Sequence, residues 1–199
     1  MSIRKLRVHL LRVCFAPVVL IAVFVRPAWP VGSEVAFAVE LAGYLFLLAG
    51  LGIRIWSILY VGGHKSHILV TEGPYSICRN PLYVGTLLLA IGAGLCFENL
   101  LMLIVTVAIV LPAHVAATLL EERHLEEKFP EEYPAYKRRV PRFWPCLGNY
   151  RSRGTVEVSV SAIGRVMIDT VAILLLPEVE DILEVLHQHG ILPVLWRFP

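Results

Sequence analysis

Apolar and polar segments alternate along the first 120 residues in a pattern typical of membrane helices. Residues 13–25, 35–53, 82–97 and 100–120 are almost continuously apolar, and polar residues separate them. A helix of about 20 apolar residues crosses the hydrocarbon core of a bilayer. The pattern predicts an all-α integral membrane protein with about four transmembrane helices. The polar pair 98–99 predicts a tight turn, so the last two spans should be antiparallel.

The fourth apolar segment continues into a charged stretch with helical periodicity. Glu121, Leu125 and Phe129 recur every four residues and share one face of the predicted helix. Glu122 lies on the neighbouring, more polar face. We therefore expect Glu121, and not Glu122, to point toward the protein interior.

The C-terminal part has a weaker pattern. Residues 155–160 alternate in polarity, which indicates a short strand. Residues 166–176 are apolar but too few to span, and Pro177 follows them. Residues 179–186 have apolar positions at helical spacing. We expect a re-entrant or interfacial helical segment here.

The composition agrees with a membrane protein of one domain. Of the 199 residues, 57% are hydrophobic and 17% are charged, and the mean hydropathy is +0.69. A soluble domain has about one quarter charged residues. We interpret residues 1–199 as one domain, with anchor helices in 1–54, a core in 55–145 and a C-terminal extension in 146–199.

The basic residues are distributed unevenly. In this topology fifteen of the 18 Lys and Arg residues fall on one side of the membrane, and Arg26 falls in the opposite loop. By the positive-inside rule the N-terminus, residues 54–81 and the region after residue 120 are cytosolic. Membrane lipid head groups explain this charge better than nucleic acid, since the basic residues lack aromatic interleaving on a soluble module. The four Cys residues lack metal-ligand spacing, so we predict no metal site.

Residues 67–83 form a polar stretch between two apolar segments. Gly73 and Pro74 are a turn signal. Asn80 and Pro81 predict a helix start, because Asn is a favoured N-cap and Pro is favoured at the first helical position. The free N–H groups of such a helix start can bind an anion.

These elements predict a pocket at the cytosolic face that contains His67, Tyr75, Asn80, Tyr83 and Glu121. Two aromatic faces and a carboxylate suit a positively charged ligand. A helix N-terminus suits a carboxylate, so a zwitterion with an additional onium centre fits both. The alternative is that the two Tyr residues belong to the interfacial aromatic belt and that Glu121 pairs with a nearby Arg.

The segment 67–85 together with 121–141 resembles the isoprenylcysteine carboxyl methyltransferase family, which in turn resembles membrane phospholipid N-methyltransferases. The resemblance implies S-adenosyl-L-methionine as the methyl donor and a lipophilic acceptor that enters from the bilayer. It also implies a catalytic role for Glu121. The implied donor site comprises His67, Ile68, Leu69, Val70, Tyr75, Asn80, Pro81, Leu82, Tyr83 and Glu121.

Two positions depart from the family pattern. Asn80 stands where the family usually has His, and it cannot carry charge. Ala117 stands where the eukaryotic enzymes have an Arg, one turn before Glu121, that meets the substrate. Arg139 and Arg142 are the plausible substitutes for binding a substrate carboxylate.

The resemblance predicts an S-adenosylmethionine-dependent methyltransferase of the isoprenylcysteine carboxyl methyltransferase type. Most of its catalysis would be positioning and exclusion of water. The first alternative is a methyltransferase that acts on a phospholipid or small-molecule amine. An NADPH-dependent sterol or enone reductase and a non-enzymatic lipid-binding membrane protein are the others.

Overall fold

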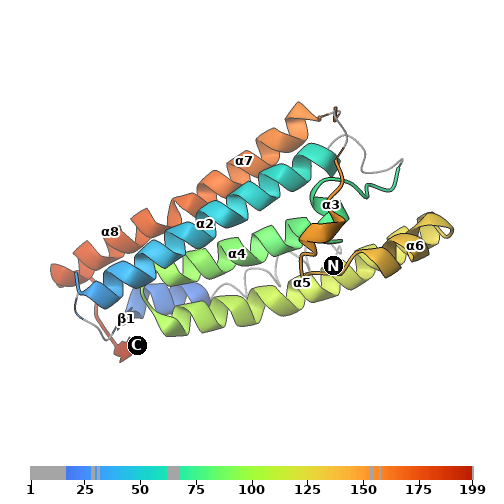
Figure 1. The fold of residues 1–199 in the computed structure, drawn as a ribbon. Helices are drawn as coiled ribbons and strands as arrows, with labels where there is room; N and C mark the ends of the chain where they lie inside the picture. Colours follow the sequence, from blue (N-terminus) through green and yellow to red (C-terminus); the bar gives the residue numbers. More distant parts are fainter. Residues whose placement is uncertain are drawn as a thin grey trace. The chain divides into compact units, whose positions relative to one another are not determined.

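The computed structural model describes residues 17–27, 30, 32–61, 68–152, 155–156 and 158–198. The described residues are mainly helical (Figure 1). The elements are β1 (Val25–Pro27), α2 (Glu34–Val61), α3 (Pro74–Ile77), α4 (Pro81–Cys96), α5 (Leu100–Lys128), α6 (Glu132–Arg139), the 3₁₀ helix η1 (Leu147–Asn149), α7 (Val160–Leu174), α8 (Leu176–Gln188) and β2 (Trp196–Phe198).

The chain divides into two compact units, and the long helices contribute residues to both. The first unit comprises Met1–Leu47, Ala90–Val110 and Leu174–Pro199, and the second comprises Leu48–Leu89 and Leu111–Ile173.

In the first unit, α2, α4 and α5 pack closely through small residues. A Cβ atom at Gly92 would lie 2.8 Å from the Gly43 carbonyl oxygen, so glycine permits this approach of α4 to α2. Glu98 adopts a φ of 49° in the turn between α4 and α5. The Asn99 side chain accepts hydrogen bonds from the Leu101 and Met102 N–H groups at 2.9 and 3.2 Å, and so caps α5. The predicted tight turn is confirmed.

The ends of the described chain meet in the first unit. Residues 17–24 are helical and lead into β1, which pairs in parallel with β2 (Figure 1). Arg26 of β1 forms ion pairs with Glu180 and Glu184 of α8, at 3.1 and 3.5 Å. The sequence pattern gave no indication of this two-stranded sheet.

In the second unit, the remaining part of α2 packs against α4 and α7. A Cβ atom at Gly50 would lie 2.7 Å from the Gly85 carbonyl oxygen. Ile58 of α2 packs with Ala162 and Val166 of α7. A second cluster, formed by Tyr133, Tyr136 and Val140, joins α6 to the end of α5. These contacts build the walls of the site described below.

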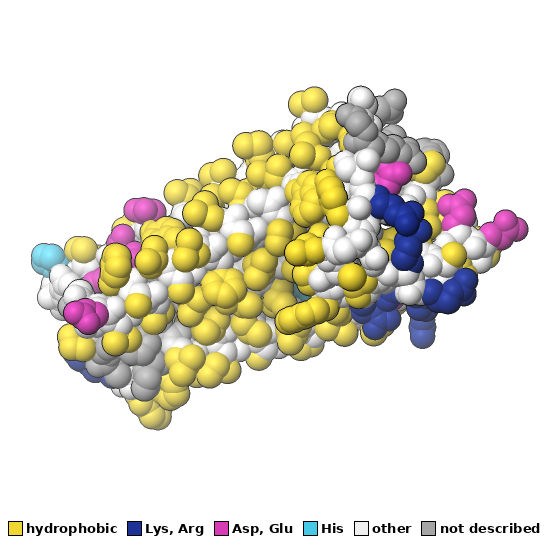
Figure 2. Space-filling model, viewed as in Figure 1, with side chains coloured by type: hydrophobic (Ala, Val, Ile, Leu, Met, Phe, Trp, Pro, Cys, Tyr) yellow, Lys and Arg dark blue, Asp and Glu magenta, His cyan; other side chains and the backbone are white. Residues whose placement is uncertain are grey.

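Three helical segments of the described chain are long and apolar enough to cross a membrane: Glu34–Val61, Leu100–Lys128 and Val160–Gln188. Helix α4 is apolar but has only 16 residues. The expected class of all-α membrane protein is confirmed, whereas the expected count of four spans is not. Figure 2 shows hydrophobic side chains over the helices and Lys and Arg side chains gathered around α6.

The structure corrects three expectations. The stretch 155–160 forms no strand in its described residues, and helix α7 begins at Val160. The apolar stretch 166–176 is part of a longer helical segment, Val160–Gln188, which is long enough to span a membrane. Pro177 does not interrupt this segment, because it lies in the first turn of α8, where proline is compatible with a helix. Helix α2 does not end with the second apolar segment, 35–53, but continues to Val61. The expected start of α4 at Asn80-Pro81 is confirmed.

Candidate active site

The second unit contains a cavity of about 530 Å³. Its walls come from α2, the loop 68–80, α4, α5, the residues around α6, and α7. Its lining includes eight of the ten residues expected in the donor site: Ile68, Leu69, Val70, Tyr75, Asn80, Leu82, Tyr83 and Glu121. Pro81 is buried at the start of α4 and does not line the cavity. His67 lies outside the described residues.

The loop 68–80 is fixed by the segment that follows α6. Backbone hydrogen bonds join Gly73 N to Arg151 O at 2.7 Å, Arg79 N to Pro141 O at 2.9 Å, and Cys146 N to Ile77 O at 2.9 Å. The Tyr136 hydroxyl donates to the Tyr75 carbonyl oxygen at 2.8 Å. The cavity wall therefore has a defined backbone conformation before any ligand binds.

Burial raises the pKa of two groups of this loop. The Tyr75 side chain is buried, which raises its pKa well above the usual value, and the nearby Glu121 charge acts in the same direction. Burial also raises the pKa of the Cys78 thiol to about 11. The Cys78 thiol donates to the Arg142 and Phe143 carbonyl oxygens, both at 3.4 Å. Neither group is set up as a base.

Tyr83 connects α4 to α5 across the cavity. Its hydroxyl donates to Glu121 Oε2 at 2.9 Å, and its ring and the His114 ring form a T-shaped pair with centroids 5.5 Å apart. Glu121 is an exposed residue that lines the cavity. Tyr83 therefore contacts the Glu121 carboxylate through its hydroxyl, and Tyr75 lines the same cavity.

Glu122 is buried, and the expectation that Glu121 points toward the interior in its place was wrong. Glu122 is 4% exposed and accepts from Asn80 Nδ2 at 3.0 Å. It also forms ion pairs with Arg79 at 3.2 Å and Arg142 at 2.9 Å. Two guanidinium groups and an amide offset the desolvation cost of burying this carboxylate.

The periodicity could not distinguish the two glutamates. Leu125 and Phe129 follow Glu121 by four and eight positions and follow Glu122 by three and seven, and both spacings fit one helical face. Thr118, which is fully buried, lies one turn before Glu122 and marks the inward face. Glu121 lies at the edge of this face, beside the cavity.

The two expected substrate arginines lie outside the cavity lining. Arg142 pairs with Glu122, and this hydrogen bond raises the Arg142 pKa. Arg139 is exposed, and its carbonyl oxygen accepts from Asn149 Nδ2 at 2.9 Å. A role of either residue in substrate binding stays a prediction.

Several polar residues of the cavity were missed by sequence reasoning. His114 and Lys128 line it together with Glu121. These three residues recur every seven positions and so share a face of α5, which is a signal that the sequence contained. Arg54 of α2 also lines the cavity. It directly follows the apolar segment 35–53 and was not considered as a site residue.

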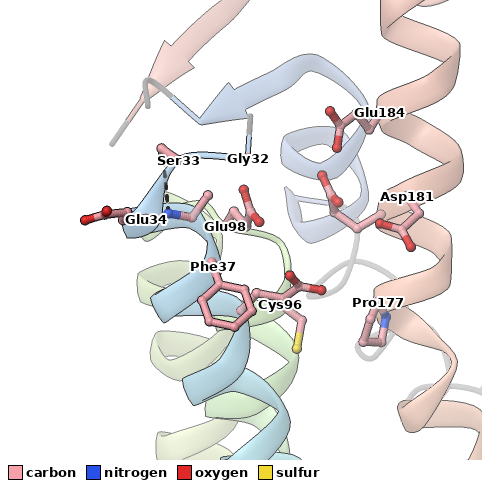
Figure 3. A pocket seen from close by; sticks show the side chains of 12 residues that line it. Gly32, Ser33, Glu34, Phe37, Cys96, Glu98, Pro177, Asp181 and Glu184 are labelled. Carbon is pink, nitrogen blue, oxygen red and sulfur yellow. Dashed lines mark hydrogen bonds between the residues drawn. The ribbon is translucent and has the colours of Figure 1, made fainter. Parts of the chain in front are cut away.

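A second cavity, of about 500 Å³, lies in the first unit (Figure 3). Its lining is strongly acidic and comes from α2, the α4–α5 turn and α8. The acidic residues are Glu34, Glu40, Glu98, Glu180, Asp181 and Glu184. Among the described residues no group of three or more His, Cys, Asp or Glu side chains has an arrangement that could hold a metal ion.

Residues 38–132 match the phospholipid methyltransferase family. The chain is 40% identical over 139 residues to the cobalt-zinc-cadmium resistance protein CzcN of Cupriavidus metallidurans, covering 70% of this chain and 64% of that one. It is 36% identical over 149 residues to the nickel-cobalt-cadmium resistance protein NccN of Alcaligenes xylosoxydans xylosoxydans, covering 73% and 68%. It is 31% identical to the protein-S-isoprenylcysteine O-methyltransferase of Rattus norvegicus over 129 residues, covering 60% and 45%.

The chain belongs to the membrane methyltransferase family related to isoprenylcysteine carboxyl methyltransferase. The predicted resemblance is thereby confirmed. The family match, 38–132, contains the loop 68–80, α4 and Glu121, which form part of the cavity wall. The chain spans about two thirds of the length of CzcN and NccN. No solved structure matches the chain.

Proposed function

We propose that the chain is an integral membrane methyltransferase that uses S-adenosyl-L-methionine and a lipophilic acceptor. The observation that carries the proposal is the cavity of the second unit, in which Tyr75, Tyr83 and Glu121 lie together beside the fixed loop 68–80. The family relationship supports methyl transfer as the type of reaction.

The cavity fits the donor in size and in chemistry. Its volume of about 530 Å³ lies in the range of small-molecule sites. Glu121 and the Tyr rings suit the sulfonium centre. Ile68, Leu69 and Val70 offer an apolar wall, and Leu82 carries the first N–H group of α4, at the end that favours a carboxylate.

When bound, S-adenosylmethionine supplies a methyl group to a nucleophilic oxygen or nitrogen of the acceptor. The residues of this chain would act mainly by holding the two reactants in line and by excluding water. Tyr83 fixes the Glu121 carboxylate through its hydroxyl. A carboxylate substrate needs no base. An amine substrate must first lose a proton, and Glu121 is the cavity carboxylate that could take it.

The relatives support two acceptor classes. One is a prenylcysteine-like carboxylate, as in the name of the Rattus norvegicus relative. The other is a phospholipid amine, as in the phosphatidylethanolamine N-methyltransferase B of Dictyostelium discoideum, which is 27% identical over 107 residues. The missing Arg at Ala117 leaves the choice between these classes open to experiment. We retain the cytosolic placement of the site as a prediction from the distribution of basic residues.

Transfer of a radiolabelled methyl group from S-adenosylmethionine to a native lipid extract tests the proposal. We expect the purified protein to label a lipophilic product, and mass spectrometry of that product to identify its class. Glu121→Gln should reduce labelling, whereas Gly52→Ala, at a position with open space around its Cβ, should not. No labelled product together with no binding of S-adenosylhomocysteine would contradict the proposal.

The names of CzcN and NccN favour a physiological role in metal resistance. We infer that such a role would depend on methyl transfer to a membrane component. Expression of this chain in a Cupriavidus metallidurans strain that lacks CzcN tests the inference. We expect the wild-type chain to increase growth in cadmium and Glu121→Gln to fail; equal growth with both would separate resistance from methyl transfer.

A further inference from the structure

We propose that Arg54, held by Thr86, binds the anionic group of the lipophilic acceptor, a carboxylate or a phosphate. The inference rests on the proposed function and deepens it, since it names the recognised chemistry of the second substrate. Arg54 and Thr86 both line the cavity that contains Tyr83 and Glu121.

Arg54 has unused hydrogen-bonding capacity. Its Nη1 donates to the Thr86 hydroxyl, and that hydroxyl in turn donates to the Leu82 carbonyl oxygen at 2.9 Å. Its Nε is buried and has no hydrogen-bond partner among the residues that the structure describes. Within the described residues, no carboxylate lies within ion-pair distance of the Arg54 guanidinium, and Asp169 of α7 acts on it only from beyond that distance. The guanidinium is therefore oriented but has no direct ion-pair partner among the described residues.

Such a charge is unfavourable where Arg54 lies. It precedes the last residue of α2, Val61, by seven positions, in a helix long and apolar enough to cross a membrane. Charged side chains within such helices are costly and usually pair with a partner or serve a functional site. A ligand that brings an anion to this position would supply a direct ion-pair partner, which Asp169 does not provide at its longer distance.

The neighbouring helix leaves space for the Arg54 side chain. A Cβ atom at Gly85 of α4 would lie 2.8 Å from Arg54 Cγ. Gly85 also lies close to Gly50 of α2. A Cβ atom at Gly85 would lie 3.0 Å from the Gly50 carbonyl oxygen, and a Cβ atom at Gly50 would lie 2.7 Å from the Gly85 carbonyl oxygen. Two glycines thus allow the arginine stem to pass between the helices and reach the cavity.

The position along α4 favours the acceptor over the donor. The expected donor residues lie in the loop 68–80 and at the start of α4. Thr86 follows Tyr83 by three residues, which is about one helical turn further from that loop. A phospholipid amine that enters from the apolar end would therefore place its phosphate at Arg54 while its amine reaches the level of Tyr83 and Glu121. In a prenylcysteine the carboxylate is itself the nucleophile, so one of its oxygens would contact Arg54 while the other faces the donor.

The other cations are less suited to this role. Arg79 is paired with Glu122, and Arg142 lies outside the cavity lining. Lys128 lies at the last residue of α5, at the loop end. The planar guanidinium of Arg54 matches a carboxylate or a phosphate through paired N–H donors. Both acceptor classes carry such a group: the carboxylate of a prenylcysteine and the phosphate of a phospholipid.

The test measures binding of dodecanoate, dodecyl phosphate and dodecanol to the full chain in lipid nanodiscs, with and without S-adenosylhomocysteine. The three probes share one tail and differ in charge. We expect at least one anion to bind about tenfold more tightly than dodecanol. Arg54→Gln should abolish this preference and Arg54→Lys should retain part of it. Affinity for S-adenosylhomocysteine should change less than about twofold in both variants, which also shows that they are folded.

Turnover then distinguishes the two sources of the anion. Loss of methylation of N-acetyl-S-farnesylcysteine in Arg54→Gln assigns the carboxylate, and loss with phosphatidylethanolamine assigns the phosphate. Gly52→Ala on the same helix is the matched control. An anion preference that survives Arg54→Gln, or no preference in the wild type, overturns the inference. A tenfold loss of S-adenosylhomocysteine affinity in Arg54→Gln would instead assign Arg54 to the donor. If the wild type does not bind S-adenosylhomocysteine, the proposed function is contradicted but the inference about Arg54 is not. The preference for anions is measured in the absence of S-adenosylhomocysteine as well.

Discussion

Neutralising Glu122 should lower the stability of the protein, whereas neutralising Glu121 should lower its affinity for the methyl donor. Glu122→Gln removes the charge that pairs with Arg79, and the side chains of this pair are 6% and 7% exposed. Removing one partner of a buried ion pair destabilises a protein by about 3–5 kcal/mol. Arg142 is 39% exposed, so water screens its share, and glutamine keeps an oxygen that can accept from Asn80. We therefore expect a loss of about 3 kcal/mol in the free energy of unfolding.

Glu121→Gln should leave stability almost unchanged, since Glu121 is exposed and accepts one hydrogen bond from Tyr83. It should weaken binding of S-adenosylmethionine by about 1–3 kcal/mol, the range for a hydrogen bond to a charged group. A loss of 1.4 kcal/mol corresponds to about a tenfold increase in the dissociation constant.

Two measurements on the same detergent-solubilised samples decide between these effects. Denaturant unfolding gives the stability, and calorimetric titration gives the affinity for donor and product. Each variant should change one quantity far more than the other. Equal losses of donor affinity in folded Glu121→Gln and Glu122→Gln proteins would refute the assignment of Glu121 to the cavity and Glu122 to the interior.

Three further outcomes are expected. The pKa of Cys78 is raised to about 11 in the folded protein from a usual value of 9.0. The neutral thiol should therefore stabilise the folded state fully below pH 9, and this stabilisation should be lost as the pH rises toward 11. Denaturant unfolding should show that the free energy of unfolding decreases less over this pH window in Cys78→Ala than in the wild type. With one cysteine placed at Ser66 or at Ser33 of a cysteine-free chain, an impermeant thiol reagent added to intact cells should label the Ser33 position alone; labelling of Ser66→Cys would overturn the cytosolic placement. Glu40→Gln in the first unit should keep turnover within about twofold, or about 0.4 kcal/mol of barrier, and a tenfold loss measured in the methyl-transfer assay would mean that the site is misplaced.

The sequence predicted the helical elements well where a local signal marked their ends. Asn80 and Pro81 begin α4, and the polar pair 98–99 forms the turn before α5, because capping and turn preferences are local. The C-terminal segment was predicted poorly, since Pro177 was interpreted as a break. Proline in the first turn of a helix lacks only an N–H group that would be unpaired there, and α8 begins one residue before it.

The candidate site could be predicted in its residues but less well in its orientations. Tyr75, Tyr83 and Glu121 line one cavity as expected. Glu122 was assigned to the wrong face because its partners Arg79 and Arg142 are 43 and 20 positions away in the sequence. Periodicity carries no information about such distant partners. Arg54 was overlooked for the same reason, since its role depends on the space that Gly85 leaves in another helix.

The anchoring of the loop 68–80 has a consequence for how the protein is made. The loop's partners emerge late in synthesis: Asn80 bonds to the Arg142 carbonyl oxygen, 62 positions later, and Ser76 accepts from Arg151, 75 positions later. A ribosome that has completed α4 and α5 has therefore not yet supplied the residues that fix the donor-side wall. The nascent chain should acquire ligand affinity only after residue 151 has been released, well after its first helices have entered the membrane.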